Sequence, residues 1–592
     1  MQLRTLTLAL TAAGLFTACG GSGDPAPVAE TSTTVTLTGV AARGAALAGA
    51  AVSAKCASGT GTATTSSSGS YSLAVAAGAL PCVLKVTSSD SATVLHSVAV
   101  AGSSSTAATS NITPLTELLV AQLSATDPAA YMTSVAAAAL GAAVTGTTVS
   151  TAQTAVVKTL TAAGVSTGSI GNMVTDTLVA ATGSSSGNGY DLVLDALSDA
   201  ITDAGTTLAA LTTTVAAVAA GTSGTTPATY SSAASLPAEL LLKPQASNCS
   251  ALRSGSYRVV KLAPSLTTGA SDAVTTTEIM NFDASTLTAT WADGESTVWT
   301  GTGNCSYNVT GGNFEAFVSQ AGVIVVRAHV GADDTSTSAP DTMRIVVMLP
   351  KQDIAVSELA GTWNVLSWDG HPAFAVNAGI ATVASNGALS SAKCFDESLT
   401  LAEAGCATDS TALPVFSAHA GGGFNLTSTD TTEAWVDRGF AYRAGNGDLM
   451  VLLLNAQGEF SLLTKYRTLG LPAVGDVVSD WSLLVNTGNL AAFSVSAQQN
   501  TITALGSGSF TRTALNLDTG ISVPQTITNN GPRNGYRYRP AASVTGSDGN
   551  PATVRETFSL PLAGMGFAAF YQSSNSTGST SNARFGLSVT KP

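Results

Sequence analysis

The spacing of apolar residues changes twice along the chain, and this change limits the fold more than any other feature of the sequence. From residue 34 to about residue 100, apolar and polar residues alternate in short runs that end at glycine, which is typical of β-strands joined by tight turns. Between 111 and 220, apolar residues recur every three or four positions, as in amphipathic helices. From 246 onward the alternation returns, and the runs 449–454 and 459–466 flank a polar turn that predicts a hairpin.

This pattern predicts a mainly β, multidomain protein. We expect an N-terminal β-sandwich, an Ala-rich helical middle domain and a large C-terminal antiparallel β region of barrel or sandwich units. Gly, Ser, Thr and Pro dominate two stretches that bury too little apolar area to fold. The predicted segments are a lipoprotein signal peptide (1–18), a tether (19–33), a β-sandwich (34–105), a helical domain (111–220), a linker (221–245) and three β domains (246–352, 353–470 and 471–592).

Start signals place several helices in the middle domain. Thr113-Pro114 and Asp127-Pro128 each combine a capping side chain with a proline in the first turn, and the second pair predicts a helix over 129–140. A further helix is expected to begin at residue 150 or 151. The clearest helix spans 190–204, where apolar residues recur at i, i+3, i+4, i+7 and i+11.

Charge and motif content narrow the classes of function. Charged residues make up only 10% of the chain and its formal net charge is −13, so nucleic acid is not expected as a partner. No apolar run beyond residue 18 is long enough to predict a membrane-spanning helix. The sequence has no P-loop, dinucleotide-binding fingerprint, EF-hand or zinc-protease motif, and we expect no cofactor.

The N-terminus predicts export and lipid anchoring. Arg4 precedes an apolar run over 6–18, which is typical of a signal peptide that is removed from the mature protein. The run ends in Leu15-Phe16-Thr17-Ala18-Cys19, which resembles a bacterial lipobox. The resemblance implies an acylated Cys19 and the lipid bilayer as a partner. Gly20 then implies the outer membrane of a Gram-negative bacterium, on the periplasmic or the exposed side. An ordinary secretory signal with an incidental cysteine is the alternative.

Residues 34–105 repeat a pattern of glycine turns between alternating strands. The pattern comprises Gly39, Leu47-x-Gly49-Ala50-x-Val52, Thr65-x-x-x-Gly69-x-Tyr71-x-Leu73 and Leu84-x-Val86. This segment resembles the carboxypeptidase regulatory-like, transthyretin-like domain, which implies an accessory β-sandwich without catalytic residues. The remainder is similar to uncharacterised proteobacterial lipoproteins, and that similarity implies no activity.

The cysteines are consistent with an oxidising compartment. The chain has seven, an odd number that leaves a free thiol unless Cys19 is acylated. The other six fall into local groups within single predicted domains, and none has the Cys-x-x-Cys spacing of metal or redox sites. We therefore expect the disulfides Cys56–Cys82, Cys249–Cys305 and Cys394–Cys406, although six cysteines allow other pairings.

An acidic stripe follows one face of the predicted helix over 190–204. Asp191, Asp195 and Asp199 are four residues apart, so their like charges lie close together. A hard cation such as Ca²⁺ would relieve this repulsion, and the three carboxylates are the candidate metal ligands. A solvated helix face explains the stripe without any metal, and we prefer that interpretation.

The run from Arg533 to residue 539 has the highest density of positive charge in the chain. On a strand, Tyr536 and Tyr538 share one face while Arg537 and Arg539 share the other. In the usual arrangement the tyrosines pack inward and the arginines point to solvent. In the alternative, exposed tyrosines stack on sugars and the arginines hold acidic groups of a glycan. The two tyrosines and two arginines are the candidate ligand-binding residues.

No residue pattern predicts a catalytic site. His96, His329, His371 and His419 lie far apart, without a second His or Cys at ligand spacing. The Gly-x-Ser-x-Gly match at 183–187 lies in low-complexity sequence and not between a strand and a helix. The sequence therefore predicts a membrane-anchored, non-catalytic binding or scaffold lipoprotein of the cell envelope, with a glycan or an envelope protein as partner. A glycan-binding accessory lipoprotein and an uncharacterised hydrolase are the alternatives.

Overall fold

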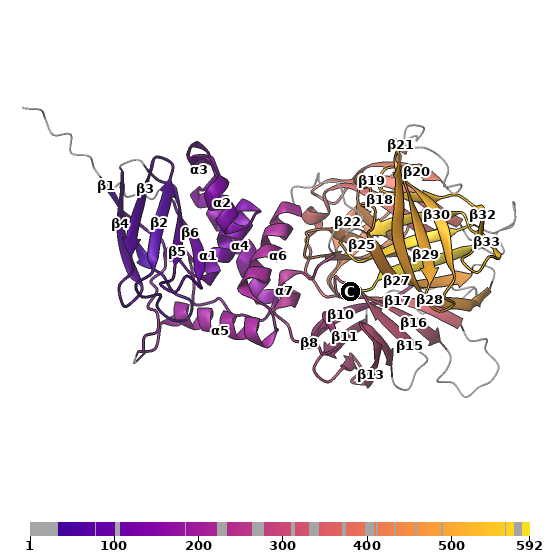
Figure 1. The fold of residues 1–592 in the computed structure, drawn as a ribbon, viewed down its shortest axis with the longest axis horizontal. Helices are drawn as coiled ribbons and strands as arrows, with labels where there is room; N and C mark the ends of the chain where they lie inside the picture. The colour runs from indigo at the N-terminus through magenta and orange to yellow at the C-terminus, as the bar shows by residue number, and fades with distance from the viewer. Residues whose placement is uncertain are drawn as a thin grey trace, which may run out of the picture.

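The computed structural model describes residues 34–76, 79–100, 107–183, 185–221, 234–262, 278–309, 314–330, 342–369, 375–396, 408–409, 413–430, 434–455, 459–486, 489–562, 564–573 and 583–592. Within them the chain is mainly β, with several sheets and a helical part, so the predicted fold class is confirmed. A sandwich lies at one end of the molecule, the helices follow it, and the remaining strands form the other end (Figure 1). Cys19 precedes the described residues.

The N-terminal sandwich consists of two sheets, with strand orders β4-β1-β7 and β3-β2-β5-β6. Alternate residues face the space between the sheets, so Val35 and Leu37 of β1 are buried. Cys56 and Cys82 are cross-strand partners on β2 and β5 and form a disulfide, which confirms that predicted pair. The strands are β1 (Thr34–Val40), β2 (Ala51–Cys56), β3 (Gly59–Thr64), β4 (Ser70–Ala76), β5 (Cys82–Thr87), β6 (Val94–Ala99) and β7 (Ala107–Thr109).

Helix α1 is the centre of the helical part. Thr113 caps it and Pro114 occupies its first turn, as predicted, and it packs against α4, α6 and strand β6. Glu117 on α1 lies 2.9 Å from Nδ1 of the buried His96 on β6, which links the helices to the sandwich. The helices are α1 (Pro114–Ser124), α2 (Pro128–Ser134), α3 (Ala137–Ala143), α4 (Gly146–Ala162), α5 (Gly189–Asp203), α6 (Leu208–Gly221) and α7 (Ala238–Leu241).

None of the helices in the described ranges is long and apolar enough by itself to cross a membrane. Helices α5 and α6 meet that criterion only as a pair, across a bend of 97°.

Two predicted helix boundaries are wrong. The helix predicted over 129–140 is two helices, α2 and α3, because residues 135–136 are extended. Helix α4 begins one turn earlier than predicted, at Gly146. Thr145 caps it by accepting from the N–H of Thr148, and the Thr148 hydroxyl in turn accepts from the N–H of Thr145. Threonine occupies the position where a capping box usually has Glu or Gln, so the sequence pattern did not reveal it.

Strands β10 to β17 close an eight-stranded antiparallel barrel that side chains fill. Aromatic rings from four strands lie buried inside it, and their consecutive centroids are 6.4, 5.0 and 5.8 Å apart: Tyr257, Phe282, Trp299 and Tyr307. The strands are β10 (Gly255–Leu262), β11 (Glu278–Asp283), β12 (Thr288–Trp291), β13 (Ser296–Gly303), β14 (Ser306–Val309), β15 (Phe314–Val318), β16 (Ile324–Val330) and β17 (Thr342–Pro350).

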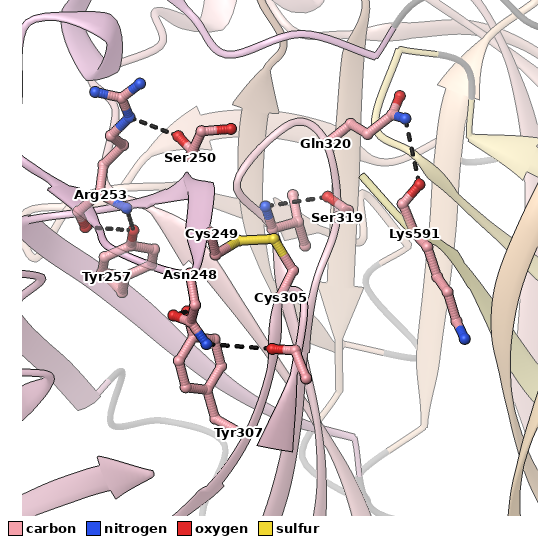
Figure 2. Close-up of a disulfide and its surroundings, with 12 residues drawn as sticks. Asn248, Cys249, Ser250, Arg253, Tyr257, Cys305, Tyr307, Ser319, Gln320 and Lys591 are labelled. Carbon is pink, nitrogen blue, oxygen red and sulfur yellow. Dashed lines mark hydrogen bonds between the residues drawn. A yellow bond between two sulfur atoms is a disulfide. The ribbon is translucent and has the colours of Figure 1, made fainter. Parts of the chain in front are cut away.

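A short two-stranded ribbon of β8 (Gln245–Ala246) and β9 (Cys249–Arg253) is joined to this first barrel by a disulfide bond. Cys249 in β9 forms a disulfide with Cys305 in the turn between β13 and β14, which confirms the second predicted pair (Figure 2). Beside it the Tyr307 hydroxyl donates to Oδ1 of Asn248 at 2.6 Å. Cys406 and the side chain of Cys394 lie outside the described residues, so the third predicted pair is not described.

A nine-stranded sheet follows, in the order β21-β20-β19-β18-β26-β25-β24-β23-β22, and it curls until Ala388, just before β20, forms a bridge with Val415 of the end strand β22. Its hairpin of β25 and β26 confirms the predicted one. The strands are β18 (Gly361–Asp369), β19 (Ala375–Val383), β20 (Leu389–Asp396), β21 (Thr408–Asp409), β22 (Val415–Ala418), β23 (Phe424–Thr427), β24 (Val436–Arg443), β25 (Leu449–Leu454) and β26 (Phe460–Lys465). One face of this sheet, which includes Trp363, surrounds a separate hydrophobic core. The other face packs into the larger core that the sheet shares with both barrels.

The C-terminal strands close a second eight-stranded barrel, which packs against the nine-stranded sheet. The ring of Phe585 on β36 lies 4.8 Å from that of Trp368 and 5.1 Å from that of Phe460, both on the sheet. The barrel strands are β27 (Val477–Asn486), β28 (Asn489–Gly506), β29 (Ser509–Asn516), β30 (Ser522–Asn529), β31 (Arg537–Arg539), β34 (Thr557–Leu562), β35 (Phe567–Gln572) and β36 (Arg584–Thr590), and the hairpin of β32 (Ala542–Thr545) and β33 (Pro551–Val554) lies between β31 and β34 in sequence.

Candidate functional site

The strands of the C-terminal barrel direct polar side chains inward. On β27, Asp480 and Ser482 line the interior, whereas Trp481 and Leu483 belong to the core shared with the nine-stranded sheet. The same alternation holds on β36, where Ser588 lines the interior. Successive side chains of a strand point to opposite faces. The apolar side chains of these strands pack outward against another sheet, so the polar side chains between them point into the barrel. The barrel therefore has an apolar contact surface outside and a polar interior.

This interior holds a cavity of about 860 Å³. A volume of this size is in the range of small-molecule binding sites, roughly 300–1,000 Å³. The first barrel has the same number of strands, but aromatic rings fill it. The cationic residues that line the cavity are Arg512, Arg537, Arg539, Arg555, Arg584 and Lys591, and the acidic ones are Asp480 and Asp518. The wall of the cavity is thus predominantly cationic.

Two of these arginines converge on one neutral oxygen. Arg512 donates from Nε and Nη2 to Oε1 of Gln525, at 3.0 and 2.9 Å, and Arg539 donates from Nη1 to the same oxygen at 2.8 Å. Arg539 also donates to the hydroxyl of Thr557 at 2.5 Å. Burial and the nearby Arg512 guanidinium lower the pKa of Arg539 to about 9. Arg539 therefore remains charged at neutral pH, and neither arginine is bonded to a carboxylate within the described part of the chain.

The other arginines extend the cationic wall. Arg537 donates to Oδ1 of Asn529 at 3.0 Å and lies over the ring of Phe510. Arg555 donates to a backbone carbonyl at 3.3 Å, and burial together with the charge of Arg584 lowers its pKa. These side chains are half-buried, so their charges are partly removed from water.

The two acidic residues of the cavity have partners of their own. Asp480 is 6% exposed, and its Oδ2 accepts from the side-chain N–H of Asn500 at 2.7 Å. Burial raises the pKa of Asp480, although the charge of Arg512 opposes the shift. Asp518 accepts from the backbone N–H of Ala497 at 3.1 Å. The acidic groups therefore do not form close ion pairs with the Arg512 and Arg539 side chains.

The structure separates the four candidate residues on β31 and beside it. Tyr536 has no exposed surface, and its hydroxyl donates to the carbonyl of Val365, lies 3.0 Å from the carbonyl of Gly379 and accepts from the N–H of Val365. It therefore anchors the barrel to the nine-stranded sheet and offers no face for a sugar. Tyr538 is half-buried and donates to Oε1 of Glu556 at 2.7 Å.

Arg537 and Arg539 do not point to solvent, as the usual arrangement of a strand would have them, but line the cavity. The expectation failed because it assumed an apolar interior for the barrel. Here the apolar face of β31 meets another sheet, and the arginines occupy the interior.

The other candidate residues lie far from this cavity in the chain and in the fold. Asp191 is buried on α5 and accepts from the N–H of Ala181 at 3.0 Å, whereas Asp195 and Asp199 are exposed. In the described ranges no group of three or more His, Cys, Asp or Glu side chains is placed to hold a metal ion. The histidines are not brought together either: His96 lies in the sandwich and His419 beside β22, while His371 and the side chain of His329 lie outside the described residues.

Sequence reasoning missed Arg512, Gln525, Arg555 and Arg584 as members of the same site. A signal was present, because residues 471–592 contain seven Lys and Arg against five Asp and Glu. This segment therefore has a net charge of +2 in a chain of net charge −13. Six of its seven cationic residues line the cavity.

Comparison with known proteins gives little guidance. No family model matches the chain, and no curated protein matches it. Two solved structures of transferrin binding protein B match over 53% of this chain, a point mutant from Haemophilus parasuis at 10% identity and the isotype 1 protein from serogroup B Neisseria meningitidis at 7% identity. The match covers 65% and 63% of those chains, under two thirds in each case, and the TM-score is 0.14 for both. Such a likeness carries no argument about this chain.

Proposed function

We propose that the chain is a lipid-anchored, non-catalytic binding protein of the cell envelope, whose ligand occupies the cavity of the C-terminal barrel. The supporting observation is the contrast between two barrels of equal strand number, one filled by aromatic rings and one that surrounds about 860 Å³ with polar groups. Filling the second barrel with apolar side chains would stabilise it more, since burial of apolar area favours folding. A polar cavity is therefore better explained by a ligand than by stability.

The polar groups of the cavity favour binding over hydrolysis. Binding requires donors that converge on an open volume, and the arginines provide them. Hydrolysis by a serine nucleophile requires a base within hydrogen-bonding reach, most often a histidine. The residues that line the cavity include serines but, among those described, no histidine.

The remaining domains would serve as a spacer in this proposal. The sandwich, which resembles an accessory domain, and the helices lie between the N-terminal end of the described chain and the barrels (Figure 1). With Cys19 acylated and residues 19–33 as a tether, the binding barrel would stand away from an outer-membrane surface.

The lipid anchor is tested by Cys19→Ala. We expect the wild-type protein to fractionate with membranes and to incorporate a labelled fatty acid, and the variant to lose both properties. A wild-type protein that stays soluble and unlabelled would contradict the anchor but would leave the cavity untouched.

The cavity is tested by filling it. Ala568 is half-buried on the inner face of β35, so Ala568→Trp should occupy part of the volume. Thr526→Trp on the exposed outer face of β30 is the matched control. A panel of neutral and acidic oligosaccharides and small metabolites should contain a compound that raises the melting temperature of the wild type and of Thr526→Trp but not of Ala568→Trp. Equal responses from all three proteins, or none from any, would contradict a binding role for the cavity.

A further inference from the structure

The charge inside the C-terminal barrel is opposite to that of the chain. Six cationic residues face the cavity against two acidic ones, although the chain as a whole has a net charge of −13. Placing like charges together in a partly desolvated space is unfavourable, because charges interact more strongly where water is excluded. The chain has 24 Lys and Arg residues, and a quarter of them line this one cavity. This arrangement requires either a structural reason or an anionic ligand.

The hydrogen bonds of Arg512 and Arg539 give no sufficient structural reason. Three N–H groups of the two side chains share Oε1 of Gln525, and a carboxamide oxygen has only two lone pairs. A guanidinium has five N–H donors, and Nη1 of Arg512 makes no hydrogen bond within the described part of the chain. Donors are therefore in excess of acceptors among the described residues around Gln525, and an oxyanion bound there would accept hydrogen bonds from them.

Strand register places a second cationic centre at the same level of the barrel. Arg539 is the cross-strand partner of Thr557, Thr557 of Gln572, and Gln572 of Arg584. Adjacent strands lie about 4.8 Å apart, so Arg539 and Arg584 are separated by about 14 Å along the wall. Arg555 lies near Arg584, whose positive charge contributes to the lowered pKa of Arg555. The polar residues between them, Thr557 and Gln572, also line the cavity.

We propose that this cavity binds a molecule carrying two or more oxyanion groups, carboxylate or phosphate, one at Arg512 and Arg539 and another at Arg584 and Arg555. The proposal rests on the proposed function and adds the chemical class of the ligand. The planar guanidinium matches both carboxylate and phosphate, and a bound oxyanion would accept hydrogen bonds from the excess donors and neutralise the like charges. The volume of about 860 Å³ admits a molecule of the size of an acidic oligosaccharide of a few units.

The test measures binding by titration calorimetry on the mature chain at low salt and at physiological salt. The probes are citrate for carboxylates, pyrophosphate for phosphates, uronate-containing and phosphate-containing oligosaccharides, and a neutral oligosaccharide of the same length. We expect one anionic series to bind, with an affinity that falls as salt is added, and the neutral oligosaccharide not to bind. The stronger series, citrate and uronates or pyrophosphate and phosphorylated sugars, identifies the oxyanion.

Two arginine variants separate a binding role from a structural one. Arg512→Gln combined with Arg539→Gln should weaken binding by about tenfold to a hundredfold or more, because charge-assisted hydrogen bonds are lost. Without ligand, the same variant should melt at the same or a higher temperature, since like charges have been removed from the cavity. Arg43→Gln combined with Lys351→Gln is the matched control, because both side chains are exposed outside the C-terminal barrel and their loss changes the net charge by the same two units. It should bind as the wild type does.

The outcomes distinguish this proposal from the proposed function. Neutral sugars that bind as tightly as anions, and that Ala568→Trp excludes, would uphold a binding cavity and overturn its anionic selectivity. An unchanged affinity in the double arginine variant, or a marked fall in its melting temperature without ligand, would also overturn the selectivity. If no probe of either charge binds, both proposals fail.

Discussion

The clearest test of the interface between the C-terminal barrel and the nine-stranded sheet is the substitution Tyr536→Phe. Tyr536 is fully buried, and its hydroxyl is within 3.1 Å of the N–H and 2.7 Å of the carbonyl of Val365, and 3.0 Å from the carbonyl of Gly379. Val365 and Gly379 are cross-strand partners on β18 and β19. A single hydroxyl therefore joins the barrel to two strands of the sheet. The substitution removes only this oxygen and keeps the ring, which lies 4.9 Å from that of Phe558.

The expected cost is about 2–3 kcal/mol in the free energy of unfolding. The variant loses one donated and one accepted hydrogen bond to buried backbone groups, at about 1–1.5 kcal/mol each. For a cooperative unit of roughly 150–250 residues, about 1 kcal/mol lowers the melting temperature by about 2–4 °C. Differential scanning calorimetry should therefore show a decrease of about 4–12 °C in the transition of the C-terminal region.

Tyr538→Phe is the matched control, two residues away. Its hydroxyl donates to Glu556 and the residue is half-buried, so water can replace the lost bond and the cost should stay below about 1 kcal/mol. Equal shifts for the two variants would refute the claim that Tyr536 fastens the barrel to the sheet. A shift in the sandwich transition instead of the C-terminal one would refute it as well.

Two further perturbations test the fold at other points. Replacing Cys249 and Cys305 together by serine should cost about 4 kcal/mol, because their bond closes a loop of sequence separation 56, and denaturant unfolding with and without reductant would measure it. Burial raises the pKa of the Asp480 carboxyl in the folded chain. Between the ordinary carboxyl pKa and this raised pKa, the folded chain holds a proton that the unfolded chain has released. The free energy of unfolding should therefore fall as pH rises through this interval. Asp480→Asn should remove this dependence and raise the melting temperature at neutral pH, and an unchanged pH profile would contradict the argument.

Local features of the sequence were sufficient for the fold class and for several elements. The Thr113-Pro114 start, the β25–β26 hairpin and the Cys56–Cys82 and Cys249–Cys305 bonds depend on residues that are near in sequence or within one domain. Capping, turn formation and short-range loop closure act over such distances, so a pattern in the sequence is enough to predict them.

Which face of a strand lies inside the barrel depended on the tertiary structure alone. Alternation showed that Tyr536 and Arg537 point to opposite faces, but it carries no information on which face meets another sheet. The nine-stranded sheet covers the tyrosine face, and the cavity therefore receives Arg537 and Arg539. Gln525 and Arg584 join them only because β30 and β36 belong to the same closed barrel. Strand order and closure are long-range properties, and so the sequence determined the strands while the packing of one sheet on another determined the site.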